Sequence, residues 1–264
     1  MTSSLRITGI QTILHWEDKR ANLEMFGKKI MSITSPTEVV VLPEMFSTGF
    51  SMKPELLAET MEGETLEWMK GIAMRKKIIL TGSAIIKEDG HYFNRLIWML
   101  PNGQSGHYDK HHLFAYGDED QHYSAGHKRL IASVNGWKLN LFVCYDLRFP
   151  VWARQQNSFE YDVLIYVANW PERRIEAWKT LLRARAIENQ CYVVGVNRVG
   201  DDGSHIHYSG GSMVIGPSGE ILYLKNEEED IFTVVLDKSQ LDTVREKFPF
   251  WKDADRFKII PNSE

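Results

Sequence analysis

Residues 139–150 read LNLFVCYDLRFP, and this stretch determines the fold that we predict. Its first five residues are typical of a strand, which ends at Cys144, where a turn begins. We expect a helix over residues 151–157, because Pro150 suits the first position of a helix. The N–H groups around the turn would face the sulfur and favour its thiolate form. Most free cysteines are simply small buried residues, so partners elsewhere must decide the role of Cys144.

Two further polar side chains suggest such partners. The predicted strand 38–42 is followed by Glu44, so a carboxylate lies at a strand end in the same way as Cys144. Residues 108–114, YDKHHLF, place Lys110 among aromatic and apolar neighbours, where a partly buried lysine needs a reason. Glu44 could instead cap a helix, and Lys110 could lie along the surface with its ammonium in water. The three residue types together favour a catalytic site.

These three segments resemble the Glu, Lys and Cys motifs of the nitrilase (carbon–nitrogen hydrolase) superfamily, in the order found in that family. Residues 182–190, LRARAIENQ, resemble the helix that precedes a late core strand in those proteins. Residues 167–171, VANWP, are most similar to the ω-amidase branch, which hydrolyses the terminal amide of 2-oxoglutaramate and 2-oxosuccinamate. The resemblance covers nearly the whole chain, and it implies a small amide as substrate and no cofactor.

The resemblance assigns a role to each motif. Amide hydrolysis needs a nucleophile, a base, donors to the oxyanion and an acid for the leaving ammonia. Glu44 is expected to take the proton of Cys144, whose sulfur attacks the amide carbon and becomes a thioester. Lys110 and the backbone N–H of Tyr145 are expected to hold the oxyanion. Glu44 then protonates the ammonia and activates the water that releases the acid.

A second acid is expected after Lys110, where Asp118, Glu119 and Asp120 follow one another. The family places its second glutamate a few residues before a glycine, and Glu119 best fits the spacing to Gly126. The neighbouring acids leave a shift of one residue open. A solvated acidic loop is the alternative interpretation.

Substrate choice depends on the cation that binds a remote carboxylate, a task that suits the planar guanidinium of arginine. Arg173 and Arg174 follow the 167–171 segment, and we favour Arg174; an exposed helix start is the alternative for both. Arg148 is also placed at the pocket, although a structural ion pair is its expected role. The other predicted substrate-binding residues are aromatic: Phe50, Phe114, Tyr145 and Trp170.

Other functions remain open. Aliphatic amides, nitriles and N-carbamoyl compounds need the same Cys, Glu and Lys set, and a non-catalytic interaction protein could retain the fold. A histidine of the lysine segment could pair with Cys144 as in a protease, but Glu44 and Lys110 would then have no role. A zinc site lacks the HExxH pattern and paired cysteine ligands. The histidines concerned are His107, His111, His112, His122 and His127.

Composition favours one soluble enzyme domain over residues 1–264, since no linker or repeat divides the chain. A net charge of −4 argues against nucleic-acid or anionic-membrane binding. No apolar run could span a membrane, and residues 1–6 lack the apolar core of a signal peptide. A nucleophilic thiol predicts the reducing cytoplasm. Cys191, inside an apolar run, is expected in the core.

The pattern of apolar residues predicts an α/β fold with mixed sheets. Strands are expected at residues 5–14, 38–42, 78–86, 162–168 and 191–197, and helices at 18–33, 64–76 and 174–190. The turn pairs Asp89-Gly90 and Asn135-Gly136 predict hairpins.

The resemblance implies a four-layer α-β-β-α sandwich with its reactive residues at strand ends. It also implies a homodimer that pairs through outer helices, here residues 151–157 and 174–190. Trp152 and Trp178 are candidate anchors of that interface, with packing inside the monomer as the alternative. On the second helix, the face expected to pack inward carries Ala177, Leu181, Ala184 and Ile187.

Overall fold

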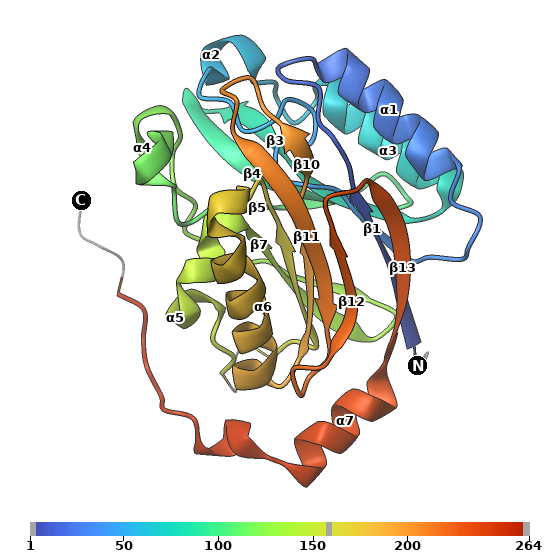
Figure 1. The fold of residues 1–264 in the computed structure, drawn as a ribbon, viewed down its shortest axis with the longest axis vertical. Coiled ribbons are helices and arrows are strands. Elements are labelled where there is room, and N and C mark those ends of the chain that lie inside the picture. Colours follow the sequence, from blue (N-terminus) through green and yellow to red (C-terminus); the bar gives the residue numbers. More distant parts are fainter. Residues whose placement is uncertain (1–3, 157–159, 261–264) are drawn as a thin grey trace.

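Two mixed β-sheets pack face to face between two pairs of helices (Figure 1). The computed structural model describes residues 4–156 and 160–260. Helices α1 and α3 cover one outer face, and α5 and α6 cover the opposite one. The predicted α-β-β-α sandwich with mixed sheets is therefore confirmed.

The first sheet has the strand order β13-β1-β2-β3-β4-β5. Strands β1, β2 and β3 are parallel, and the others join them in antiparallel pairs. The helices α1 and α3 pack side chains such as Phe26 and Met69 against Val40. The bounds are β1 (Ser4–Gln11), α1 (Lys19–Met31), β2 (Val39–Val41), α3 (Glu64–Lys76), β3 (Ile79–Glu88), β4 (His91–Met99), β5 (Ser105–Asp109) and β13 (Asp230–Asp237).

The second sheet has the order β10-β11-β9-β8-β7-β6, and β12 pairs with β11. Its centre, β7 to β9, is parallel and mostly apolar, as expected for strands covered on both faces. Cys191 lies buried just before β9, as predicted. The bounds are β6 (Ile131–Val134), β7 (Trp137–Val143), α5 (Pro150–Ala153), β8 (Val163–Val167), α6 (Ile175–Asn189), β9 (Tyr192–Val196), β10 (Val199–Asp201), β11 (His207–Ile215) and β12 (Ile221–Asn226).

The two predicted hairpin turns are confirmed. Both residues of Asp89-Gly90 and of Asn135-Gly136 have positive φ, which matches a tight hairpin turn. Asp18 caps α1 by accepting a hydrogen bond from the backbone N–H of Ala21 at 3.0 Å. The remaining helices are α2 (Pro54–Leu57), α4 (Glu119–His122) and α7 (Lys238–Lys247). Within the described residues, no helix has the length and apolar character needed to cross a membrane.

The outer helices differ from their predictions. Helix α5 has only the four residues Pro150–Ala153, and Asn157 lies outside the described residues. Helix α6 is rotated relative to the expected face, so that Ile187 is 50% exposed while Trp178 is fully buried. The reason is polar: Arg185 is buried because its guanidinium donates to the carbonyl of Leu147 at 2.6 Å.

Neither tryptophan is available as the interface anchor that was considered. The indole N–H of Trp178 donates to the carbonyl of Gly211 at 2.8 Å inside the monomer. Trp152 is also buried, and its indole donates to the hydroxyl of Tyr108 at 3.0 Å. Both therefore serve the core of the chain itself.

Candidate active site

Cys144 lies where β7 ends, at the first position of the short 3-10 segment Cys144–Arg148. Its φ of 43° is in the left-handed region, which a non-glycine residue adopts only when its surroundings hold it there. Asp146 contributes to this by accepting a hydrogen bond from the N–H of Val143 at 3.1 Å. The sequence prediction that helical N–H groups would favour a thiolate is wrong. Burial raises the pKa of the Cys144 thiol well above its ordinary value, and the Glu44 carboxylate raises it further.

Glu44 follows β2 and is fully buried. Its Oε1 accepts hydrogen bonds from the Nζ of Lys110 at 2.9 Å and from the amide of Asn94 at 2.8 Å. Its Oε2 accepts one from the backbone N–H of Asn169 at 2.8 Å. These donors fix the orientation of a carboxylate that lies close enough to Cys144 to raise the pKa of its thiol.

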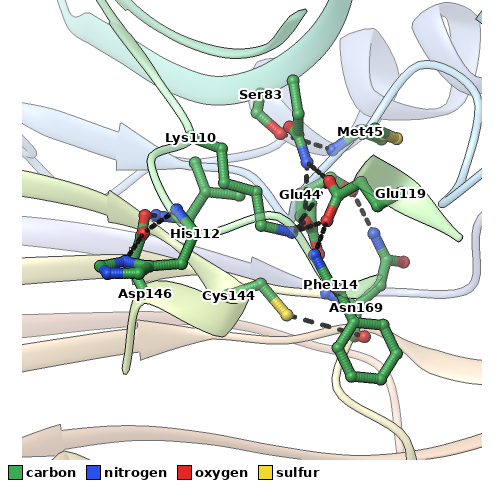
Figure 2. A network of polar contacts seen from close by, with 12 residues as sticks. Glu44, Met45, Ser83, Lys110, His112, Phe114, Glu119, Cys144, Asp146 and Asn169 are labelled. Carbon is green, nitrogen blue, oxygen red and sulfur yellow. Dashed lines mark hydrogen bonds and ion pairs between the residues drawn. The ribbon is translucent and has the colours of Figure 1, made fainter. Parts of the chain in front are cut away.

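Lys110 directly follows β5 and extends its ammonium between two carboxylates (Figure 2). The Nζ lies 2.8 and 3.0 Å from the two oxygens of Glu119, in addition to its contact with Glu44. Burial alone would lower the pKa of Lys110, but Glu119 and Glu44 together raise it above its ordinary value. The lysine is therefore a fixed cation, not a base.

Glu119 begins α4 and is fully buried, so the choice of this acid over its acidic neighbours agrees with its place in the structure. Besides Lys110, its carboxylate accepts from the N–H of Phe114 at 2.7 Å and from Asn94 at 3.1 Å. Burial raises the pKa of Glu119, and the nearby Glu44 adds to that, while Lys110 opposes both. Two acids and one ammonium are thus buried together.

Two asparagines of this network were missed by the sequence analysis. Asn94 donates to both glutamates from the middle of β4, where a polar residue in a buried strand was the available signal. Asn169 ends the apolar run of β8, and its amide donates to the backbone carbonyl of Glu44 at 2.6 Å. The Cys144 sulfur lies 3.9 Å from the carbonyl of Asn169 (Figure 2).

A cavity of about 230 Å³ opens above the sulfur. Lys110 and Cys144 both line it, whereas Glu44 and Glu119 do not, since they are buried behind the lysine. Aromatic side chains form much of its wall. All six residues predicted to bind substrate are part of the lining: Phe50, Phe114, Tyr145, Arg148, Trp170 and Arg174.

Three arginines also line the cavity, and each guanidinium lies over an aromatic ring. Arg148 lies 4.9 Å from the ring centre of Trp170, and Arg174 lies 5.0 Å from that of Phe114. Arg173 is the third. Over residues 4–156 and 160–260, none of the three forms an ion pair, so the structural ion pair expected for Arg148 is wrong. Burial and then the charge of Arg173 lower the pKa of Arg174. Three cationic side chains thus line the same cavity as the nucleophile.

The histidines take other positions. His111 stacks on Trp152 with ring centres 3.8 Å apart, and His112 stacks on Phe149 at the same distance. The Nδ1 of His112 lies 2.8 Å from a carboxylate oxygen of Asp146. A cysteine and histidine dyad is therefore not assembled. In the part of the chain that the structure describes, no three His, Cys, Asp or Glu side chains are arranged to hold a metal ion.

Comparison with known proteins gives a consistent result. The family model for carbon-nitrogen hydrolases matches residues 5–246. The chain is 44% identical over 257 residues to omega-amidase YafV of Escherichia coli K12, covering 97% of this chain and 98% of that protein. It is 34% identical over 219 residues to 2-oxoglutaramate amidase of Bacillus subtilis, covering 82% and 84%. A CN-hydrolase superfamily protein from Xanthomonas campestris, solved with an arsenic adduct in its active site, superposes with a TM-score of 0.95 at 40% identity, covering 98% and 100%.

Proposed function

The chain belongs to the carbon–nitrogen hydrolase family, and from this premise we propose that it is an ω-amidase. It cleaves the terminal amide of small 2-oxo dicarboxylate monoamides, such as 2-oxoglutaramate and 2-oxosuccinamate, to the acid and ammonia. The observation that carries the proposal is a cavity lined both by Cys144 and Lys110 and by three arginines that form no ion pair among the described residues. The relatives named omega-amidase and 2-oxoglutaramate amidase support the same substrate class.

In this mechanism the buried thiol of Cys144 is deprotonated by Glu44 only as it reacts. Glu44 takes the proton of Cys144 as the sulfur attacks the amide carbon, so that the charge passes from the carboxylate to the substrate oxygen. When the tetrahedral intermediate collapses, the carbon–nitrogen bond breaks and Glu44 returns the proton to the departing ammonia. The acyl group remains on sulfur as a thioester. Glu44 then deprotonates a water that attacks the thioester, and it returns this proton to the sulfur as the carbon–sulfur bond breaks, which restores the thiol and the carboxylate.

The oxyanion is held by Lys110 and the backbone N–H of Tyr145. The lysine ammonium carries three hydrogens, and its carboxylate contacts need only two of them when one is shared between the oxygens of Glu119. The third is then available to the cavity that Lys110 lines. Its raised pKa keeps the ammonium charged throughout turnover.

The substrate carboxylate is assigned to the arginines of the cavity. Arg174 is partly buried, faces no carboxylate within the described residues and has its pKa lowered by that burial. A bound substrate carboxylate would pair with this guanidinium and compensate for its burial. A neutral amide of the same length offers no such gain, which is why the proposal selects a substrate with a charged end.

Ammonia release by the purified protein tests the proposal. We expect turnover of 2-oxoglutaramate and 2-oxosuccinamate, with much lower kcat/KM for a neutral aliphatic amide, a nitrile or an N-carbamoyl amino acid. Cys144→Ala should abolish turnover, whereas Cys191→Ala should retain it. Preference for one of the other compounds would reassign the substrate within the family. No turnover of any compound would favour a non-catalytic interaction protein.

A further inference from the structure

Asn94 contacts all three members of the buried charge cluster. Its Nδ2 donates to Glu44 at 2.8 Å and to Glu119 at 3.1 Å, and its backbone carbonyl accepts from the N–H of Lys110 at 3.0 Å. We propose that Asn94 is a positioning residue that joins the two carboxylates through the two hydrogens of one amide nitrogen. The proposal rests on the proposed role of Glu44 as the base.

The position of Asn94 suits this task. It lies in the middle of β4, fully buried, where it pairs with Ile85 of β3. The strand is held on both sides, because β5 pairs with it on the other edge. The amide is therefore carried by a rigid element, not by a loop, and its nitrogen is fixed relative to both acids.

No other residue type of this size supplies the same contacts. An amide nitrogen has two hydrogens and no charge, so it can donate to two carboxylates without neutralising either. A serine hydroxyl donates only once, and an aspartate would add a third negative charge beside Glu44 and Glu119. The reverse orientation of the amide would place its oxygen against both carboxylates. The contacts thus fix which atom faces the acids.

The other atom of the amide shows that stability alone does not account for this residue. Within the described chain, the Oδ1 of Asn94 is buried without a hydrogen-bond partner. An unpartnered buried oxygen destabilises a folded protein, and a leucine of similar volume would avoid it. A feature that costs stability at the centre of a charge cluster points to a role in function.

The consequence concerns the direction in which Glu44 points. Its Oε1 is held by Lys110 and Asn94, and its Oε2 by the N–H of Asn169, so the carboxylate cannot rotate freely. The charged or titratable groups that interact with Glu44 are Lys110, Glu119 and Cys144, with the hydroxyls of Tyr123 and Tyr208. Without Asn94, one donor to the carboxylate form is lost and the repulsion from Glu119 is no longer bridged.

Asn94→Leu tests the proposal on the purified enzyme. We expect kcat to fall roughly ten- to hundredfold, as for the loss of a hydrogen bond to a charged group. KM for the ω-amide should change by less than about threefold, because Asn94 does not line the cavity. The acidic limb of the kcat/KM profile should move to higher pH, since the carboxylate form of the base loses a donor. Asn94→Ser should lie between wild type and Asn94→Leu on both measures.

Asn140→Leu is the matched control. Asn140 lies in β7, is fully buried and, among the described residues, has no hydrogen-bond partner for either amide atom. It should leave kcat and the pH profile unchanged. If Asn94→Leu and Asn94→Ser lower only the melting temperature, with the wild-type kcat and pH profile, Asn94 is merely structural and the proposal is overturned.

A second measurement separates this proposal from the proposed substrate. Iodoacetamide alkylates the thiol of Cys144 with no need for the true substrate, and Glu44 should still assist that reaction as a base. Asn94→Leu is expected to slow alkylation near neutral pH by roughly tenfold, even if the ω-amides prove not to be substrates. An unchanged alkylation rate would reject the positioning role while leaving the amidase function intact.

Discussion

Cys144 depends on a neighbouring base because the protein does not stabilise its thiolate. Its burial and the nearby negative charge both favour the protonated thiol. In Glu44→Gln the base is gone, but the burial, which is the largest cause of the raised pKa, remains. The alkylation rate of this variant should therefore rise by about tenfold per pH unit through pH 9, with no plateau at the ordinary pKa of cysteine. Mass spectrometry of the iodoacetamide adduct measures it, with Cys144→Ala to show that Cys191 is unlabelled. A plateau below pH 8 would contradict the raised pKa.

The arginines of the cavity make a second residue-scale prediction. Arg174→Ala should lower kcat/KM for 2-oxosuccinamate by roughly thirty- to several-thousandfold, the effect of removing one partner of a buried charge pair. The loss should be much smaller for a neutral amide of similar length. Arg173→Ala is the comparison, because Arg173 lines the same cavity but is exposed, so that its loss should have a smaller effect. Equal losses on charged and neutral amides in both variants would exclude both residues as the carboxylate site.

At the scale of elements, the backbone at Gly126 packs so closely against the backbone of Asp109 that only glycine fits, and this contact holds Lys110 in place. A Cβ on Gly126 would lie 2.2 Å from the carbonyl oxygen of Asp109, just before the catalytic lysine, and the N–H of Gly126 donates to the carbonyl of Lys110 at 2.9 Å. Gly126→Ala should therefore displace Lys110 and lower the activity. It should also lower the free energy of unfolding by about 1–3 kcal/mol.

Gly71→Ala is the control for that change, because a Cβ at Gly71 in α3 meets nothing within 4 Å. It should stabilise the helix by about 0.5–1 kcal/mol and leave activity unchanged. Urea unfolding of both variants measures the difference. A Gly126→Ala variant as stable and active as wild type would show that the Asp109 backbone yields easily.

The helices and strands also show which features of the fold could be predicted from the sequence and which could not. Helix α3 has the predicted bounds, because the apolar residues Leu66, Met69 and Ala73 recur at helical spacing and are all buried. The face of α6 was mispredicted because Arg185, which a hydrophobic pattern places in solvent, is buried by its bond to the carbonyl of Leu147. Asn94 was missed for a related reason, since its partners come from segments distant in the sequence. The four catalytic candidates, Glu44, Lys110, Glu119 and Cys144, lie at the ends of helices or strands or in turns, where they could be recognised from sequence motifs.

At the scale of the whole molecule, we propose that two copies of the chain pair through α5 and α6. Val151 on α5 is 54% exposed and Ile187 on α6 is 50% exposed, although both are apolar. Changing both to glutamate should convert a dimer into a monomer in sedimentation velocity, because charges resist burial. Leu56→Glu, at a site 79% exposed on α2, is the control and should leave the dimer intact. A wild-type protein that sediments as a monomer at micromolar concentration would refute the pairing.

The cytoplasmic location also stays a prediction.

The pairing of β1 with β13 affects how the protein is made. Ser4 lies opposite Asp237 and Gln11 opposite Asp230, so β1 takes as its neighbour a strand that is synthesised more than 200 residues later. At typical rates of translation that neighbour emerges roughly ten to fifty seconds later. Until then the edge of β1 exposes unpaired backbone groups, which are a template for aggregation. The nascent chain should therefore need protection by a chaperone until β13 has emerged to cover that edge.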